Sequence, residues 1–520
     1  MTGWLAARGL RRTDARRTDA RRTDALIVVV ATAGVVAYVV ASGGAGFPLD
    51  DAWIHQVYAR NLAQRGEWAF TPGQPSAGST SPLWTVMIAL GYALGLPYRA
   101  WALVLGALCL AATGMLGARV AERLFSGVRR VGVLTGLCIA LEWHLVWAAA
   151  SGMETALFGA LSMGVVALAL APVSQEGRGF RGAAWRGATL GLVGAALTAT
   201  RPEGALLVAL AALAAFAARW GRLDAGLRWV GGVAAGWLVG IAPAAWLNLS
   251  LSGSVLPNTS AAKQAEYAIL LQWPYLQRLL DVTRQLLAGA AAALLPGLVW
   301  AAATRVRESG QGFGLRALLP AAWALALLML YAARLPVTYQ HGRYVIPALP
   351  PLIVTGVGGT LLLLAAGRRT LWGRVLSRSL ALAAAGVLAV FWGVGLRLYA
   401  TDVAIIETEM VAAARYLAES IPPDALLAVH DIGAVGFFAP RPILDLAGLV
   451  SPEVIPIIRD EAALLALMEA RGAAYLMTFP GWYPHIVADP RVRLVYQTNG
   501  TAPASGGENM AIYRLAWGGE

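Results

Sequence analysis

Two adjoining stretches of sequence decide the fold of this chain. The first, LIVVVATAGVVAYVVA (26–41), is apolar, and the second, FPLDDAWIHQVYARNLAQRGEWAFTPGQPSAGSTSPLW (47–84), is polar and rich in Gly, Pro and Ser. The apolar run predicts a first membrane span, because a spanning helix needs about 20 mostly apolar residues. The polar stretch predicts that residues 44–100 form a loop on the far side of the membrane.

The amino-terminal tail sets the orientation of that span. The sequence RRTDA occurs three times between Arg11 and Ala25, so residues 1–24 form a low-complexity basic tail that cannot bury a core. No convincing cleavage signature follows the apolar run, which favours an uncleaved span over a signal peptide. Basic segments beside a first span stay in the cytoplasm. We therefore expect the amino terminus in the cytoplasm and the loop 44–100 outside.

The composition excludes an ordinary soluble enzyme. Of the 520 residues, 58% are hydrophobic and 13% are charged, against about 25% charged in a typical soluble domain. Residues 1–400 carry 34 basic and 15 acidic side chains, a net charge of +19, whereas residues 401–520 carry 7 and 14, a net charge of −7. The basic charge therefore belongs to a membrane body, and we expect no nucleic-acid partner. The two cysteines support neither a disulfide framework nor a metal motif.

Apolar segments recur along 25–400 and predict a polytopic α-helical membrane domain with about 11 spans. A window of about 20 residues places them at 26–41, 101–118, 131–149, 155–172, 187–200, 204–219, 229–248, 285–303, 317–335, 345–366 and 379–397. The shorter apolar run 82–97 is ambiguous, and the arginines decide its placement. The arginine-rich connections are 119–130, 173–186, 219–228, 304–316 and 368–378. All of them are cytoplasmic only if 82–97 does not cross, so the positive-inside rule places 82–97 in the outer interface.

The carboxyl-terminal residues 401–520 have no apolar run long enough to span a membrane. Helical patterns over Ala404–Ile421 and Glu461–Ala470 alternate with short apolar stretches that read as strands. The predicted strands are Leu426–Val429, Ile443–Leu446, Ala474–Met477, Val492–Tyr496 and Met510–Leu515. We expect a small extracytoplasmic α/β domain on a multi-pass protein of the inner (plasma) membrane.

The predicted topology brings polar motifs from distant parts of the chain to one face. The segments are Phe47–Ser81, Ser151–Thr155, Arg201–Gly204, Leu256–Tyr275 and Arg334–Tyr344. All five lie outside if 82–97 does not cross. A site built from them would therefore lie at the outer membrane–water boundary.

Asp50 and Asp51 are the leading candidates for chemistry. They begin an amphipathic helix expected over Asp51–Gln64, which would lie in the interface. One interpretation is that they cap this helix, because carboxylates there satisfy free backbone N–H groups. A single cap needs only one Asp, however, and two adjacent carboxylates at a bilayer edge repel each other. The pair is thus also a candidate general base or divalent-cation site; no cofactor is certain.

Several cations of the same face suit a phosphate group. Lys263, in LPNTSAAK, is the only lysine of the chain, and Arg343 and His341 lie together in TYQHGRY. Arg201, in TRPEG, can hold phosphate in a bidentate manner. The alternatives are a snorkelling lysine and an ion pair of Arg201 with Glu203 or Glu154.

Other polar residues give weaker signals. Glu142 and His144 fall inside a predicted span, where ionisable groups are costly, so we expect them to face a cavity. His430-Asp431-Ile432-Gly433 resembles a metal-dependent phosphohydrolase motif only superficially, because it follows a strand and lacks further ligands. The aromatic residues Phe479, Trp482 and Tyr483 suit either sugar stacking or a membrane surface.

A series of motifs, taken in their order along the chain, resembles the GT-C superfamily of polyprenyl-phosphate-sugar glycosyltransferases. The motifs are DD, YARNLA, SPLW, SGMETALF, TRPEGALL, LPNTSAAK and HGRYVIPALP. The likeness runs from about Leu49 to Pro350 and continues weakly through HDIGAVGFFAPRPILDLAGL. It is nearest to the terminal arabinofuranosyltransferase branch. One departure concerns Asn258–Lys263, where relatives often carry an aromatic residue and this chain has Thr259–Ala262, which leaves the sugar open.

The resemblance implies an inverting transferase that moves a sugar, with arabinofuranose as one candidate, from a polyprenyl phosphate to a cell-envelope glycan or lipid. It implies that Asp50 is the general base, with Asp51 as the alternate base or a cation ligand. It also implies residues that contact the donor phosphate or the substrates. These are Lys263, Arg343, His341 and Arg201 for the phosphate, and Asn258, Glu154, Glu203, Tyr58 and His55 for the substrates.

Two other classes of function fit a polytopic protein. A lipid or sugar transporter or flippase would show internal repeats and polar groups near the bilayer midplane. No repeat relates the two halves of this chain, and its polar motifs gather on one face. A catalytically inactive scaffold for envelope assembly would bind lipid-linked sugar without turnover.

Overall fold

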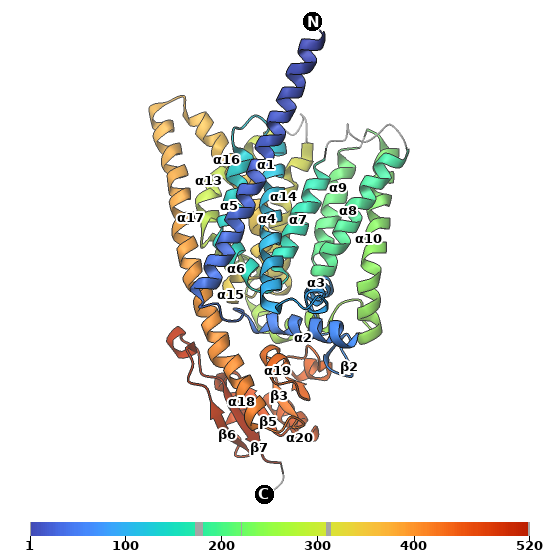
Figure 1. The fold of residues 1–520 in the computed structure, drawn as a ribbon, viewed down its shortest axis with the longest axis vertical. Helices are drawn as coiled ribbons and strands as arrows, with labels where there is room; N and C mark the ends of the chain where they lie inside the picture. The colour runs from blue at the N-terminus through green and yellow to red at the C-terminus, as the bar shows by residue number, and fades with distance from the viewer. Residues whose placement is uncertain (1, 172–179, 220, 308–313, 518–520) are drawn as a thin grey trace.

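The computed structural model describes residues 2–171, 180–219, 221–307 and 314–517. Figure 1 shows a bundle of long helices with a smaller domain of mixed helix and sheet at one end. The amino-terminal part of the first helix projects from the opposite end of the bundle. The two termini therefore lie at opposite ends of the molecule.

Each predicted span contains at least one helix. In chain order these helices are α1 (Thr2–Ala41), α4 (Tyr98–Leu124), α5 (Val131–Leu141), α6 (Trp143–Ala150), α7 (Thr155–Ala169), α8 (Phe180–Thr200), α9 (Gly204–Ala217), α10 (Leu223–Ser252), α12 (Tyr275–Leu287), α13 (Ala290–Arg307), α14 (Leu319–Arg334), α16 (Leu349–Gly367) and α17 (Leu371–Ile406). Large apolar side chains on the outer helices are exposed, among them Val239 on α10 and Leu382 on α17. Such surfaces suit contact with lipid.

The lengths and composition of the helices give a range for the number of membrane spans. Among the described residues, six helices are long and apolar enough to cross a membrane, and up to eight spans result if each bent helix pair is counted once. The helices α7 and α9 are apolar but shorter than 18 residues. The count of about 11 is therefore not confirmed. Parts of three arginine-rich connections lie outside the described residues, which exclude 172–179, 220 and 308–313.

Two predicted boundaries fall inside continuous helices. The basic tail 1–24 and the first span form the single helix α1, since Ala and Arg in the tail have high helix propensity and extend the helix that the span begins. At the other boundary, α17 continues through the π-helical turn η5 (Glu407–Val411) into α18 (Ala412–Ser420). The last membrane helix is thus joined rigidly to the carboxyl-terminal domain.

Two spans are bent, by 56° between α5 and α6 and by 110° between α12 and α13. Glu142 lies at the first bend, where its side chain accepts hydrogen bonds from the Leu145 backbone N–H (3.1 Å) and faces His144 Nδ1 at 2.9 Å. His144 Nε2 lies 3.1 Å from the Gln285 carbonyl, just before the second bend. Neither residue lines the cavity described below. They join two broken helices instead.

The helix expected over 51–64 is present as α2 (Asp50–Arg65). Figure 1 shows it crossing the end of the bundle, between the membrane helices and the smaller domain, with the short helix α3 (Pro82–Ala93) beside it. Polar side chains in its first three turns are mostly buried, because α2 packs against the carboxyl-terminal domain, α3 and the loop that follows α2. Gln56 accepts a hydrogen bond from Tyr92 (2.9 Å), and Asn61 donates to the Ala69 and Phe70 carbonyls.

The carboxyl-terminal domain matches its predicted elements closely. A five-stranded mixed sheet has the order β4-β3-β5-β7-β6, with β3 parallel to β4 and β5, and β7 antiparallel to β5 and β6. The strands are β3 (Leu427–Val429), β4 (Ile443–Asp445), β5 (Tyr475–Thr478), β6 (Val492–Gln497) and β7 (Ala511–Leu515). Helix α20 (Glu461–Ala470) covers the sheet, and the short helix α19 (Gly433–Phe438) packs on α2.

Further short elements complete the described chain. They are β1 (Ala69–Thr71), β2 (Gln74–Pro75), α11 (Asn258–Glu266), η2 (Ala268–Gln272), η3 (Gly314–Leu318), α15 (Tyr339–Gly342), η4 (Ile346–Ala348), η6 (Pro452–Ile457), η7 (Pro480–Trp482), α21 (Pro484–Val487) and η8 (Ala502–Ser505). Of these, α11 and the turn of α15 carry the residues that define the site.

Candidate active site

A cavity of about 320 Å³ lies where the helix bundle meets the carboxyl-terminal domain. All five polar segments expected on one face contribute to its wall. The polar side chains that line it are Asp51, His55, Thr80, Glu154, Arg201, Glu203, Thr259, Ser260, Lys263, Gln264, Tyr331, Arg334, Arg343 and Tyr344. Leu449 adds a wall residue from the carboxyl-terminal domain. The volume falls at the lower end of the range for small-molecule sites, about 300–1,000 Å³.

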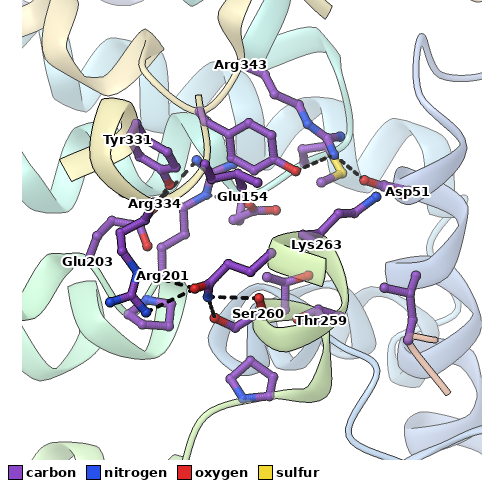
Figure 2. A pocket seen from close by; sticks show the side chains of 18 of the residues that line it. Asp51, Glu154, Arg201, Glu203, Thr259, Ser260, Lys263, Tyr331, Arg334 and Arg343 are labelled. Carbon is purple, nitrogen blue, oxygen red and sulfur yellow. Dashed lines mark hydrogen bonds and ion pairs between the residues drawn. The ribbon is translucent and has the colours of Figure 1, made fainter. Parts of the chain in front are cut away.

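One end of the cavity joins a carboxylate to two cations. Asp51 lies in the first turn of α2, and its Oδ2 accepts a hydrogen bond of 2.5 Å from Arg343 Nη2. Figure 2 shows Arg343 and Lys263 pointing toward Asp51 from two sides. Lys263 lies in α11, which begins after Pro257, and it lies 3.6 Å from Glu266 one turn further on.

Arg343 owes its position to an unusual turn. Gln340, His341 and Gly342 all have positive φ angles, of 51°, 59° and 67°. Positive φ is uncommon for residues other than glycine and costs free energy. This left-handed turn reverses the chain between α14 and α16. It directs the Arg343 guanidinium into the cavity, where its Nε and Nη1 are buried without a hydrogen-bond partner among the described residues.

The charges at this end shift the pKa of both Asp51 and Lys263. Burial alone would raise the pKa of Asp51, but the neighbouring cations Arg343 and Lys263 outweigh it and lower the pKa to about 2. Burial alone would lower the pKa of Lys263, but Tyr339, Asp51 and Glu266 around it raise that pKa well above its ordinary value. Both groups are therefore charged at neutral pH, and the cavity holds an excess of positive charge at this end.

Asp50, the first choice for a base, does not line the cavity. Its two carboxylate oxygens accept hydrogen bonds from the backbone N–H groups of Gly433 (2.6 Å) and Ala434 (2.8 Å), at the start of α19. Neither Asp50 nor Asp51 caps its own helix α2, for which the structure has no side-chain cap. Burial and the nearby Asp431 raise the pKa of Asp50 to about 8, against the opposing effect of the two backbone bonds.

The other end of the cavity is built on a buried ion pair. Arg201 Nε donates to Glu154 Oε1 at 2.7 Å, and His55 Nε2 lies 3.3 Å from the other oxygen of Glu154. Burial would raise the pKa of Glu154, but Arg201 and His55 bring it below its usual range. Glu203 accepts a hydrogen bond from Tyr331. The pairing of Arg201 with Glu154, expected as an alternative to phosphate binding, is therefore present, and both residues still face the cavity.

Three further candidate residues lie near the cavity but do not line it. Tyr58 is buried, and its hydroxyl bonds Ser76 and accepts from the Gly78 backbone N–H (3.0 Å), so it supports the loop that carries the wall residue Gly78. His341 lies 2.8 Å from Asp402 and packs edge-on against Trp143 and Trp147. Asn258 begins α11. None of the three is among the residues that line the cavity.

Other lining residues were not singled out from the sequence. Arg334 ends α14 and donates to Gln264 Oε1 at 3.0 Å, and Gln264 in turn bonds Ser260 on the same face of α11. Tyr344 accepts a hydrogen bond of 3.0 Å from Arg343. The sequence does contain a signal that places Arg334 and Tyr344 at the site, because they are the two ends of a polar segment predicted to lie on the outer face. Ser260 lies three residues before Lys263 and four before Gln264, so helical spacing places the three on one face of α11.

A metal site between the two aspartates does not fit these contacts. Both oxygens of Asp50 are bonded to backbone N–H groups, and Asp51 is surrounded by cations. Among the described residues, no group of three or more His, Cys, Asp or Glu side chains is arranged to hold a metal ion. His430 and Asp431 form an ion pair, with Nδ1 and Oδ1 3.3 Å apart.

The chain has the fold of the GT-C glycosyltransferases. Its features are the helical bundle, the transverse helix α2 and the cavity between the bundle and the carboxyl-terminal domain. The chain is similar to ArnT from Cupriavidus metallidurans, solved bound to undecaprenyl phosphate, with 16% identity, a TM-score of 0.60, and coverage of 94% of this chain and 98% of that one. It is also similar to an Archaeoglobus fulgidus oligosaccharyltransferase tethered with an acceptor peptide, with 10% identity, a TM-score of 0.57, and coverage of 88% and 69%.

Other comparisons are less informative. Arabinofuranosyltransferase AftD from Mycobacteria matches with 18% identity and a TM-score of 0.49, covering 94% of this chain and 41% of that one, which is too distant to favour a donor sugar. A family model described as a domain of unknown function, DUF8728, matches residues 401–513. No curated protein sequence matches the chain.

Proposed function

We propose that this protein is an integral membrane glycosyltransferase that moves a sugar from a polyprenyl-phosphate donor to an extracytoplasmic acceptor, with inversion at the anomeric carbon. The observation that carries the proposal is the meeting of Asp51 with Lys263 and Arg343 at one end of a cavity below the membrane bundle. The shared fold with ArnT, which has been solved with undecaprenyl phosphate, supports the same class of donor.

The unpaired nitrogens of Arg343 favour a phosphate ligand. Its side chain is only 4% exposed, yet Nε and Nη1 lack hydrogen-bond partners among the described residues. A buried donor left unpaired costs free energy, so the site favours a ligand that supplies acceptor oxygens. A guanidinium binds phosphate oxygens in pairs, and Lys263 adds a second charge.

An inverting displacement has the base and the departing phosphate on opposite faces of the anomeric carbon, so donor binding has to separate Asp51 from Arg343, to which it is hydrogen-bonded in the free protein. The Asp51 carboxylate removes the proton of the acceptor hydroxyl, whose oxygen attacks the anomeric carbon. The bond from that carbon to the phosphate oxygen breaks, and polyprenyl phosphate departs with the bonding electron pair. Lys263 and Arg343 stabilise the charge that develops on the departing phosphate. The proton remains on Asp51 until solvent accepts it.

Donor binding makes Asp51 a stronger base. Without donor, Arg343 and Lys263 hold the pKa of Asp51 near 2, which makes the carboxylate a weak proton acceptor. A donor phosphate that takes over these cations removes the compensating charge and adds a negative one, so the pKa of Asp51 rises. Asp51 would then be an effective proton acceptor only when the donor is bound.

We assign the base to Asp51 in preference to Asp50. Asp51 lines the cavity, whereas the oxygens of Asp50 are both engaged by the backbone of α19. Glu154 and Glu203, with Arg201 and His55, suit hydrogen bonds to sugar hydroxyls at the other end. We propose arabinofuranose as one candidate sugar and a cell-envelope glycan or lipid as acceptor, with the cavity on the outer side of the plasma membrane.

The experiment uses the full chain in lipid nanodiscs. The purified protein is given radiolabelled polyprenyl-phosphate sugars, each with a panel of envelope glycan acceptors, and product and anomeric configuration are recorded. We expect transfer with inversion for one donor, loss of transfer in Asp51→Asn and retained transfer in Asp50→Asn. Retention of the donor's configuration would contradict the single displacement, and full activity of Asp51→Asn would contradict the base.

The bent spans favour one rival function, because discontinuous helices form the binding sites of many transporters. Here the groups at the first bend already satisfy each other, with Glu142 bonded to Leu145 and His144. A transporter would move fluorescent lipid-linked sugar across proteoliposome membranes without forming a glycoside. A scaffold would bind the lipid without turnover. Either result, obtained with the donor that the protein binds, would replace the transferase proposal.

A further inference from the structure

A chain of alternating charges runs from the cavity into the carboxyl-terminal domain. Lys263 lies 3.6 Å from Glu266 Oε2, and the other oxygen of Glu266 lies 3.4 Å from His430 Nε2. His430 Nδ1 then lies 3.3 Å from Asp431 Oδ1. Lys263 and Glu266 belong to α11, whereas His430 and Asp431 follow strand β3 of the other domain.

These four charged side chains are largely enclosed and not spread over a surface. The side chains of Lys263, Glu266 and His430 are 18%, 16% and 12% exposed. Trp482 packs edge-on against His430, with ring centroids 4.7 Å apart. Charges in such a setting are screened little by solvent, so removal of one member affects its neighbours.

We propose that the carboxyl-terminal domain positions the phosphate-binding amine of Lys263 through the ion pair between His430 and Glu266. His430 is a positioning residue in this scheme, and it touches no substrate. The inference rests on the proposed function, because it assigns Lys263 to the donor phosphate. It gives the domain of unknown function a defined task in the site.

The physical reason is a competition for Lys263. A donor phosphate and the Glu266 carboxylate both attract the same ammonium group. While protonated His430 neutralises Glu266, the carboxylate holds Lys263 loosely enough for the amine to bind phosphate. Without that charge, Glu266 has Lys263 as its remaining cationic partner and draws the amine away from the cavity.

Burial would lower the pKa of His430, but the hydrogen bonds to Asp431 and Glu266 outweigh burial and raise it to about 9. The charged groups around His430 are Asp431 on its own strand end, Glu266 and Lys263 on α11, and Asp445 on β4; Tyr483 also faces it. The paired state is complete below about pH 6.5, the usual value for histidine, and is lost as the pH rises through 9. Phosphate binding should weaken over the same range.

The test measures binding of undecaprenyl phosphate itself, so it does not depend on finding the sugar or the acceptor. The dissociation constant is measured at pH 7.5 in nanodiscs for wild type, His430→Gln, Glu266→Gln, the double variant, and the control His485→Gln. His485 is an exposed histidine of the same domain. We expect His430→Gln to weaken binding about fivefold or more, the size typical of coupled charges, and His485→Gln to match wild type.

The double variant decides whether His430 acts through Glu266. In the Glu266→Gln background the competing carboxylate is gone, so His430→Gln should change binding by less than about twofold. Equal effects of His430→Gln in both backgrounds would overturn the proposal, as would wild-type binding by His430→Gln.

A measurement on the unmodified protein avoids any problem with folding of the variants. The dissociation constant of the wild type should rise between pH 8 and 10, whereas that of His430→Gln should not. A flat wild-type profile would overturn the proposal. Binding of undecaprenyl phosphate with no transfer to any acceptor would contradict the proposed function and leave this positioning role standing.

Discussion

Asp50 and Asp51 are neighbours in sequence, identical in chemistry and yet opposite in environment. Asp51 faces the cavity and two cations, which lower its pKa to about 2. Asp50 faces the carboxyl-terminal domain, accepts two backbone hydrogen bonds from α19, and has its pKa raised to about 8 by burial and Asp431. The two sides of one helical turn therefore have different surroundings, to which we assign different proposed tasks, one chemical and one architectural. The contrast shows that a pair of acidic residues is defined by what each one faces.

The largest expected effect follows from removing the charge on the cavity side. Asp51→Asn keeps the shape of the side chain but cannot accept a proton, so we expect transfer to fall by about 10²- to 10⁴-fold, the usual contribution of a general base. The rate is measured with saturating donor and acceptor. Asp50→Asn is the matched comparison, since it makes the same change one residue away. Equal losses in both variants would erase the distinction between the two sides.

The next effect concerns the cation that Asp51 faces. Arg343→Gln removes the charge that the phosphate would meet, and we expect binding of undecaprenyl phosphate to weaken by about 10- to 150-fold, given about 1.5–3 kcal/mol for a hydrogen bond to a charged group. Arg493→Gln, an exposed arginine on β6, is the control. Unchanged binding by Arg343→Gln would remove this residue from the phosphate site.

A smaller effect is expected on the domain side. Asp50→Asn keeps one acceptor oxygen and loses the other, so the contact with α19 weakens without being abolished. We expect faster hydrogen exchange at the Gly433 and Ala434 amides, measured by mass spectrometry, and a fall in transfer of less than about tenfold. Unchanged exchange at both amides would show that Asp50 does not hold the domain.

The pH dependence of stability gives a second readout of the same contact. Because the pKa of Asp50 in the folded protein is raised to about 8, its ionisation disfavours folding. The stabilising contribution is complete below about pH 3.9, the unfolded value, and is lost as the pH rises through 8. Thermal unfolding of Asp50→Asn should therefore vary less between pH 5 and 9 than that of wild type.

The smallest expected effect is a difference between the pH profiles of the free enzyme and of the donor complex. The pH profile of kcat/KM for the donor reports the free enzyme, in which the pKa of Asp51 is about 2, so no acid limb from this residue is expected above pH 4. The profile of kcat reports the complex, where the phosphate has taken the cations from Asp51. Its acid limb should lie at higher pH. Coincident limbs in the two profiles would contradict activation by the donor.

Much of the fold is predictable from the sequence because apolar length and strand alternation are local properties. The five strands and helix α20 lie within a few residues of their expected positions. The number of spans is harder, because the bends at Glu142 and before α13 break apolar runs that look continuous in composition. The tail 1–24 was predicted to be separate because so charged a segment cannot bury a core. Its helix propensity nevertheless makes it continuous with the first span in α1.

The site was predictable as a set of segments but not as a set of contacts. The arginine distribution alone brought five distant polar segments to one face, and all five meet in the cavity. It could not show which aspartate faces inward, because that depends on where α19 docks on α2. Nor could it give the left-handed turn before Arg343, since only one of its three residues is glycine.

The wall of the cavity has a consequence for how the protein is made. Its residues run from Asp51 near the start of the chain to Leu449 in the last domain, so the chamber stays open until that domain has been synthesised and folded against α2. A ribosome-bound intermediate in the membrane lacks this closing piece. Completion of the proposed donor site is therefore tied to biogenesis, and a copy truncated before residue 401 should not capture the donor.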